Sequence, residues 1–204
     1  MALTRSPKQL RAQRTRRELL GGARLVFGRQ GYQGATVEDI AQAAGCSKGA
    51  YYFHFASKEE TLLALLDAWI SDRTQRLAQA AAVANARVPA LAKALSWQEG
   101  GWEPELLVEF WAQAQRNGRV GERLGVAYTG WHSTIAEMLT RTGEGDVAPP
   151  GAPLRTSAGV MLAIADGFAL QSWLRVAPPR WALAQQMATA FELVARRAAL
   201  RRAG

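Results

Sequence analysis

The side chains best suited to chemistry are concentrated between Thr36 and Lys58, where amine, phenol, imidazole and hydroxyl groups follow one another closely. Groups of this kind bind phosphate oxygens, and at the start of a helix they can also read base edges in a DNA major groove. The pattern therefore favours binding to nucleic acid over covalent catalysis. The candidate contact residues are Thr36, Ser47, Lys48, Gly49, Tyr51, Tyr52, His54 and Lys58.

Several residues have expected roles that follow from their chemistry and position. Lys48 can bind guanine acceptors or a phosphate, and Gly49 lets the backbone come close to the groove. Tyr51 is expected to contact a thymine methyl group or to hydrogen-bond a base edge. We expect Phe53 and Phe55, by contrast, to pack in the core beneath this segment.

The same segment predicts two short helices joined by a tight turn. Thr36 can cap the first helix, and Asp39 stands three residues on, where an acid completes a capping box. Gly45 is expected to end that helix because glycine readily adopts the left-handed conformation of a C-cap. Ser47 then caps a second helix over 48–54. Together these signals predict a helix-turn-helix, which places its second helix in the major groove.

Net charge is distributed unevenly along the chain. Residues 1–58 carry ten Lys and Arg against three Asp and Glu, whereas residues 59–204 carry fifteen against fourteen. Almost all of the net charge of +8 therefore lies with the helix-turn-helix. A polyanionic partner of that segment explains the segregation, whereas a basic surface kept only for solubility does not predict it.

Residues 14–60 resemble the DNA-binding domain of the TetR family of transcriptional regulators. The matching pattern keeps its order without gaps and consists of Ala23, Phe27, Gly31-Tyr32, Thr36-Val37, Ile40-Ala41, Ala44-Gly45, Ser47-Lys48-Gly49, Tyr51-Tyr52-Phe53-His54-Phe55 and Lys58-Glu59. Cys46 and Ala50 depart from the pattern, because the family usually has a small aliphatic residue and often a hydroxyl residue there.

This resemblance adds expected roles. It implies that Tyr52 and His54 bind phosphate oxygens, with a hydrogen-bonded structural histidine as the alternative for His54. Lys58 is expected to bind an anion in the first turn of the next helix, and Thr36 to donate to a phosphate while it caps. The resemblance also implies a second domain that binds a small inducer or corepressor.

Residues 1–13 are expected to form a basic, disordered arm ahead of this domain. No acidic residue precedes Glu18, and apolar residues are few. Such an arm can lie along phosphates or enter a minor groove, and a solvated leader without a specific partner is an equal alternative. No apolar run follows the charges, so we do not expect a signal peptide.

Residues 61–204 predict helices throughout and no strand, which gives an all-α protein of about nine helices. Apolar residues recur at helical spacing in the segments 58–82, 88–97, 103–117, 119–141, 156–176 and 179–202. A stretch rich in Gly and Pro, Thr142 to Pro153, predicts the clearest loop. Charged residues interrupt the longest apolar stretches, so no membrane span is expected, and a single Cys suits a reducing cytoplasm.

Aromatic residues on two successive helices predict a ligand site. They can face one another and, with a few polar groups, enclose an apolar cavity of the kind that binds small molecules. Ordinary core packing is the alternative for each indole. Asp166, in an otherwise apolar helix, is costly without a partner and can pair with an Arg, bond a backbone amide or face a cationic ligand. The candidate ligand residues are Phe110, Trp111, Tyr128, Trp131, His132 and Asp166, with a helix-surface hydrogen bond as the alternative for His132.

The last two helices are expected to form a dimer interface in this second domain. Each carries a wide stripe of small and apolar residues, and two such helices from each protomer make a four-helix bundle with two-fold symmetry. The candidate interface residues are Leu162, Ala169, Trp173, Met187, Phe191 and Val194. A dimer would present two recognition helices to two half-sites about one DNA turn apart.

Three common signatures of enzymes, HExxH, GxxxxGK[ST] and CxxC, do not occur in the sequence. We therefore expect no catalytic activity, no metal and no cofactor. The prediction is a cytoplasmic one-component regulator, most simply a repressor, that binds a palindromic operator as a homodimer under the control of a small apolar or aromatic ligand. A nucleoid-type protein that coats DNA without a ligand is the alternative, but it leaves the near-neutral, Trp-rich second domain unexplained.

Overall fold

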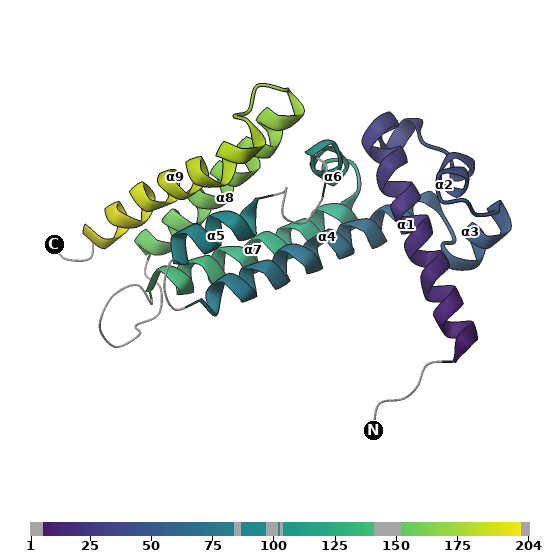
Figure 1. Ribbon diagram of the computed structural model, residues 1–204, viewed down its shortest axis with the longest axis horizontal. Coiled ribbons are helices and arrows are strands. Elements are labelled where there is room, and N and C mark those ends of the chain that lie inside the picture. Colours follow the sequence, from purple (N-terminus) through teal and green to yellow (C-terminus); the bar gives the residue numbers. More distant parts are fainter. Residues whose placement is uncertain (1–5, 84–86, 97–101, 103, 141–151, 201–204) are drawn as a thin grey trace.

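A computed structural model describes residues 6–83, 87–96, 102, 104–140 and 152–200. Within these ranges the chain forms nine helices and no strand, so the predicted all-α class is confirmed (Figure 1). The helices are α1 Pro7–Gly34, α2 Val37–Ala43, α3 Lys48–His54, α4 Lys58–Ala81, α5 Arg87–Leu95, α6 Pro104–Ala114, α7 Gly118–Thr140, α8 Ala152–Trp173 and α9 Arg180–Leu200.

Helix α1 begins well before the predicted start of the DNA-binding domain. Ser6 caps it by accepting from the Gln9 backbone N–H at 3.3 Å, and the Gln9 side chain accepts from the Ser6 N–H at 2.9 Å. This capping box satisfies two donors that a helix start otherwise leaves unpaired. The prediction of a disordered arm over residues 1–13 is therefore wrong for residues 7–13, and residues 1–5 lie outside the described chain.

Helices α2 and α3 form the predicted helix-turn-helix and pack on α1. Thr36 accepts from the Asp39 N–H at 3.1 Å, and Asp39 accepts from the Thr36 N–H at 3.0 Å. Gly45 turns the chain with a φ of 64°, in the left-handed region that favours glycine. Gly22 of α1 permits the close approach of α2, because a Cβ there would lie 2.7 Å from the Ile40 carbonyl oxygen.

Helix α4 runs without a break from the helix-turn-helix into the second part of the molecule (Figure 1). Ser57 caps it by accepting from the Glu60 N–H at 3.1 Å. Leu62, Leu66 and Trp69 lie on one stripe and are buried, as their helical spacing predicts. One rigid element thus connects the DNA-binding segment to the rest of the chain.

The remaining helices pack around α4, with α7 alongside it and α8 and α9 beyond (Figure 1). Helix α6 also packs against α1, and at this junction the Arg24 guanidinium lies 5.3 Å from the ring centre of Trp102. At the start of α7, the Asn117 side chain donates to Glu59 of α4 at 3.0 Å. Both α6 and α7 therefore contact the part of the molecule that contains the helix-turn-helix.

The loop predicted for Thr142 to Pro153 lies outside the described residues, apart from its last two residues, which begin α8. Among the described helices, none combines the length and the hydropathy that a membrane span requires.

Candidate functional site

Helix α3 presents one polar, aromatic face to solvent and one apolar face to the core. Lys48 and Gly49 are exposed at its start, and Tyr52 follows one turn later with half of its side-chain area exposed. Ser47 caps the helix by accepting from the Ala50 N–H at 3.1 Å. The end of α3 that carries its positive dipole therefore points outward together with a cation, a combination suited to phosphate and base edges.

Tyr51 lies on the opposite face and is fully buried. Its hydroxyl donates to the Ser57 carbonyl oxygen at 3.1 Å and shares a hydrogen bond with the Thr61 hydroxyl. Its ring packs against Phe55, which is buried as predicted. The prediction that Tyr51 contacts a thymine methyl group or a base edge is therefore wrong, because the side chain anchors α3 to the start of α4.

Phe53 takes the exposed position in place of Tyr51. Its side chain is 76% exposed, and its ring meets the His54 imidazole edge to face with centres 5.0 Å apart. The prediction that Phe53 packs in the core is wrong. His54 itself is half-buried in the last turn of α3. An exposed phenylalanine beside Tyr52 adds an apolar group suited to a thymine methyl or a deoxyribose ring.

Lys48 forms an ion pair with Glu38 of α2 across the turn. Accordingly, the hydrogen bond from Lys48 holds the pKa of the Glu38 carboxyl below its usual range. Both side chains are more than half exposed, so the pair is weak and can exchange for a phosphate or a guanine. Thr36 is exposed, with its hydroxyl donating to the Asp39 carboxylate at 2.7 Å.

Lys58 has a structural role in place of the predicted phosphate contact. Its ammonium group donates to the carbonyl oxygens of Tyr32 and Ala35 at 2.8 Å each, and to that of Gln33 at 3.4 Å. It also lies 4.5 Å from the centre of the Tyr32 ring. A cation placed on carbonyl groups at the end of α1 stabilises that helix end, and its three donors are already in use.

Cationic side chains extend the surface of α3 onto the N-terminal half of α1. Lys8, Arg11, Arg14, Arg16 and Arg17 are all exposed there. Figure 1 shows that the first turns of α1 project beyond α2 and α3. Two of these cations, Lys8 and Arg11, belong to the segment predicted as a disordered arm, and both are held on a helix.

The turn between α2 and α3 also contains a motif that the sequence analysis overlooked. Residues 45–49, GCSKG, have the G-x-S-x-G spacing of the nucleophile elbow of α/β-hydrolases. That elbow requires a strand before the serine, whereas here helix α2 precedes it and Ser47 caps α3. Burial raises the pKa of the neighbouring Cys46 thiol, so it does not behave as an activated nucleophile.

Three of the six predicted ligand residues, Tyr128, Trp131 and Asp166, lie against one buried arginine of α4. Two more join this group indirectly, since Phe110 packs on Trp69 and Trp111 bonds Tyr128. The guanidinium of Arg73 lies 4.7 Å from the ring centre of Trp131, 5.5 Å from that of Trp69 and 6.0 Å from that of Tyr128. It pairs with Asp166 of α8, Nη1 to Oδ1, at 3.1 Å. We call Trp69, Arg73, Phe110, Trp111, Tyr128, Trp131 and Asp166 the arginine cluster.

Hydrogen bonds connect the polar atoms of the arginine cluster in a chain. Trp111 Nε1 donates to the Tyr128 hydroxyl at 3.1 Å, and that hydroxyl donates to Asp166 Oδ2 at 2.7 Å. Desolvation, together with the nearby Asp166 charge, raises the pKa of Tyr128 far above its usual value, so the phenol stays protonated. Asp166 thus accepts hydrogen bonds from Arg73 and Tyr128. Of the partners predicted for this carboxylate, the structure shows an Arg.

Arg73 was missed in the sequence analysis, although its spacing contains the signal. It stands four residues after Trp69 and four before Leu77, on the buried stripe of α4. Only 3% of the surface area of the residue is exposed. Two of its nitrogens, Nε and Nη2, are buried and lack a hydrogen-bond partner. A buried guanidinium with unpaired donors is costly, so these two N–H groups call for an acceptor.

His132 is not among the residues that contact Arg73. It lies beside α8, where a Cβ at Gly159 would be 3.7 Å from its Nε2. Phe110 and Trp131 are fully buried and serve as core, with Trp131 Nε1 donating to the Thr74 hydroxyl at 2.9 Å. Trp111 is half-buried, which leaves it as the indole of this set that a ligand can reach most directly.

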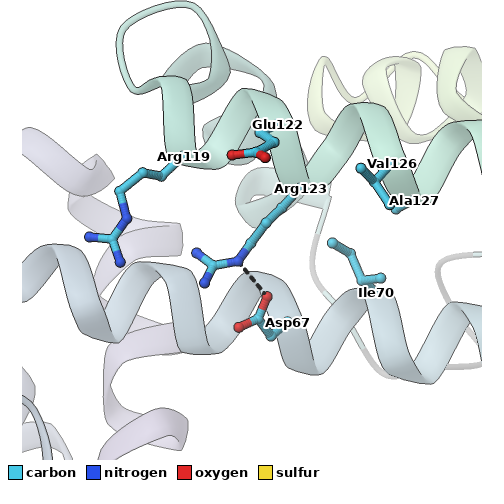
Figure 2. Close-up of a pocket in the computed structure, with 7 residues that line it drawn as sticks. All are labelled: Asp67, Ile70, Arg119, Glu122, Arg123, Val126 and Ala127. Carbon is cyan, nitrogen blue, oxygen red and sulfur yellow. Dashed lines mark ion pairs between the residues drawn. The ribbon is translucent and has the colours of Figure 1, made fainter.

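A cavity of about 420 Å³ lies between α4 and α7, outside the arginine cluster (Figure 2). Arg119 and Arg123 extend from α7 toward α4 in Figure 2, and Arg123 pairs with Asp67 at 3.0 Å. A second cavity, of about 530 Å³, lies between α4 and α5. The predicted ligand residues line neither of these two cavities.

The predicted dimer residues are mostly interior to a single protomer. Leu162, Ala169, Met187 and Phe191 are buried in the protomer's own core, so their assignment to the interface is wrong. Trp173 is partly exposed and Val194 half-buried. The large apolar residues exposed on α8, directly after it and on α9 include Val160, Leu170, Trp173, Leu174 and Leu193.

Among the described residues, no group of three or more His, Cys, Asp or Glu side chains is placed to hold a metal ion. The candidate sites are thus of two kinds. One is the exposed helix α3 flanked by cations, and the other is the aromatic cluster around the buried Arg73–Asp166 ion pair.

Comparison with known proteins finds a family model for each half of the chain. Residues 19–65 match the model of bacterial regulatory proteins of the tetR family, and residues 102–199 match the C-terminal model of BetI-type transcriptional repressors. The HTH-type transcriptional repressor AcnR of Corynebacterium efficiens is 49% identical over 51 residues, which are 25% of this chain and 27% of that protein. The chain thus matches only about a quarter of the length of this curated relative.

Solved structures share the fold over most of the chain. A TetR-family transcriptional regulator from Streptomyces coelicolor has a TM-score of 0.72 at 20% identity, covering 91% of this chain and 96% of that one. A Saccharomonospora viridis protein in complex with choline has a TM-score of 0.67 at 22% identity, covering 87% and 93%. These comparisons give no support to the DNA-coating alternative. With both family models matched in order along one chain, this protein belongs to the TetR family of transcriptional regulators.

Proposed function

We propose that this regulator is a repressor that binds a palindromic operator as a homodimer and is controlled by a small ligand. The observation that carries the proposal is the continuity of α4, which begins beside the DNA-facing helix and contributes Arg73 to the arginine cluster. The matched relatives that are named as repressors support the sign of regulation. Such a protein is expected to act in the cytoplasm, where its DNA is.

DNA binding is assigned to the exposed side of α3 and the basic half of α1. Lys48 and Gly49 would meet base edges or phosphate, and Phe53 would contact apolar groups in the groove. Tyr52 and His54 would bind phosphate oxygens and set the register. Ser47, at the start of α3, would add a phosphate contact while it caps. Thr36 would do so only by turning its hydroxyl proton from Asp39 to the phosphate.

Dimerisation is assigned to the exposed side of α8 and α9. Val160, Ala163, Gly167, Leu170 and Leu174 recur at helical spacing, and all are exposed or half-buried. An apolar stripe of this kind on a surface helix marks an interface, and a C₂ dimer would bury it against the same stripe of the partner.

Ligand control would act through the helices that the arginine cluster connects. Arg73 belongs to α4, Trp111 to α6, Tyr128 to α7 and Asp166 to α8. A ligand that inserts here would tilt α4 or shift α6, which packs on α1, and so change the separation of the two recognition helices. Its effect is limited to its differential affinity for the two arrangements, typically ~1–3 kcal/mol.

Choline, found in one structural relative, is a quaternary ammonium ion. The arginine cluster of this chain already contains a cation, so we propose an apolar or aromatic effector without a positive charge.

Selection of bound fragments from genomic DNA, followed by footprinting, tests the regulator proposal. We expect discrete protection of a palindromic site with two half-sites about one helical turn, roughly 10–10.5 base pairs, apart. Uniform protection along every fragment would instead indicate a coating protein and would overturn the proposal.

A further inference from the structure

We propose that Arg73 is a built-in cation that fills an aromatic cage, so that the effector presents a carboxylate to Arg73 and a quaternary ammonium ion is excluded. This inference rests on the proposed ligand control and names the class of ligand. It is carried by the geometry of the arginine cluster and by the two unpaired donors of Arg73.

The cage has the parts that recognise a positively charged ligand, but its own chain supplies the charge. Trp69 and Trp131 meet edge to face with ring centres 5.3 Å apart, and Tyr128 packs against Trp131 at 5.0 Å. Aromatic faces around an acidic group are the usual surroundings of a quaternary ammonium ion. Here the Arg73 guanidinium stands against those rings and pairs with Asp166. A second cation would have to displace it.

The two unpaired N–H donors of Arg73 indicate which kind of ligand the cluster can bind in place of a cation. Nη1 donates to Asp166, whereas Nε and Nη2 are buried without an acceptor. These two N–H groups lie along one edge of the planar guanidinium and point in parallel, which matches the two oxygens of a carboxylate. Asp166 does not occupy this edge of the guanidinium. Its two carboxylate oxygens accept from Arg73 Nη1 and from the Tyr128 hydroxyl instead.

The apolar part of the effector would contact the rings next to this edge. Trp111 is half-buried and donates to the Tyr128 hydroxyl, so we place the planar body of the ligand against this indole, on the partly exposed side of the cluster. An aromatic carboxylate combines the two features, an acceptor pair and a flat apolar body.

Two probes that share a benzyl group but carry opposite charges test the proposal directly. Phenylacetate and benzyltrimethylammonium would be titrated against the full-length protein, with tryptophan fluorescence and calorimetry as the readouts. We expect phenylacetate to bind at least about tenfold more tightly, which corresponds to ~1.4 kcal/mol. Equal affinities, or no binding of phenylacetate at millimolar concentration, would overturn the proposal.

Variants of Arg73 separate its charge from its shape. Arg73→Ala should reverse the preference, because Asp166 and three rings would then form an empty cage for the cation. Arg73→Lys keeps a charge but loses the parallel donors, so it should still exclude benzyltrimethylammonium while binding phenylacetate several-fold more weakly. Should Arg73→Ala fail to fold, Arg73→Lys decides, and an unchanged affinity for phenylacetate would contradict the assignment. Arg155→Ala, at an exposed position of α8, removes the same charge elsewhere and should change neither affinity.

Operator affinity measured on the same samples distinguishes this inference from the function on which it rests. If phenylacetate binds with the expected charge preference but leaves DNA affinity unchanged, the ligand class stands and ligand control fails. If DNA affinity responds to ligands of either charge equally, ligand control stands and the role assigned to Arg73 fails.

Discussion

Tyr51 and Tyr52 are adjacent tyrosines to which the structure gives opposite roles, and removing each hydroxyl should separate stability from DNA binding. Tyr51→Phe leaves the ring in the core but removes the hydroxyl that bonds the Ser57 carbonyl oxygen and the Thr61 hydroxyl. Thr61 keeps a bond to the same carbonyl at 3.2 Å, so the loss is partial. We expect a cost of about 1.5 kcal/mol.

For a chain of this size, a loss of that magnitude lowers the melting temperature by about 3–6 °C. The affinity of the folded protein for DNA should stay the same, because the Tyr51 hydroxyl does not reach the surface. Tyr52→Phe should do the reverse, since its exposed hydroxyl is assigned to phosphate. We expect an unchanged melting temperature and a five- to tenfold weaker affinity, roughly 1–1.4 kcal/mol.

Thermal melting by circular dichroism and fluorescence anisotropy with a random-sequence duplex measure both quantities. A random duplex suffices because phosphate contacts do not depend on sequence. If Tyr51→Phe weakened DNA binding at full stability, the inward orientation of α3 at this residue would be refuted. Loss of stability in Tyr52→Phe would likewise contradict its exposed position.

Three further perturbations have outcomes that follow from the structure. Lys58→Ala removes a cation from the end of α1, so it should lower the free energy of unfolding by about 1–2 kcal/mol and with it the melting temperature. The salt dependence of DNA binding should stay unchanged. A slope of log affinity against log salt concentration reduced by about 0.9 would show that Lys58 does contact phosphate. Phe191→Glu should prevent folding because it buries a charge in the protomer core. Leu193→Glu, at an exposed position of α9, should instead give a folded monomer in sedimentation. A folded, dimeric Leu193→Glu would show that the interface lies elsewhere. Bonds from the Thr36 hydroxyl and N–H hold the pKa of Asp39 below its ordinary 3.8, so its contribution to stability is present above that value and is lost as the pH falls through the folded-state pKa. Asp39→Asn should therefore flatten the acid limb of a pH–stability curve, and an unaltered limb would show that this carboxylate does not contribute.

Local signals explain why the helix-turn-helix could be predicted closely from the sequence. Thr36, Asp39, Gly45 and Ser47 each act within a few residues, through caps and a left-handed turn, and every one has the expected geometry. Such features depend on backbone chemistry and not on what packs against them.

Orientation was predicted less well, because it depends on packing between distant segments. Residues 51–55 contain five aromatic rings in about one and a half helical turns, so either face could have been the buried one. The most apolar stripes of α8 and α9 were assigned to a partner, but they fill the protomer's own core. In a bundle, the intramolecular core takes the strongest stripe and an interface uses a weaker one.

Charged residues on buried stripes were the hardest to place. Arg73 continues the spacing of Trp69, yet a lone arginine on a long helix usually indicates a solvated face. Its partner, Asp166, stands ninety-three positions away in sequence, and no local pattern connects the two. The contacts of Lys58 could not be predicted for the same reason, since its acceptors belong to the end of α1, more than twenty residues earlier.

The central claim is that two copies of α3 are held at the spacing of two half-sites, and the distance between them can be measured directly. Gln42, exposed on α2, would be replaced by Cys in a Cys46→Ala background and spin-labelled for pulsed electron paramagnetic resonance. Bound to its selected operator, the protein should give one narrow distance distribution, because each α2 is fixed to its α3 and the two α3 helices are held one DNA turn apart. The absence of dipolar coupling, or a broad distribution set only by the density of protein on DNA, would contradict the account.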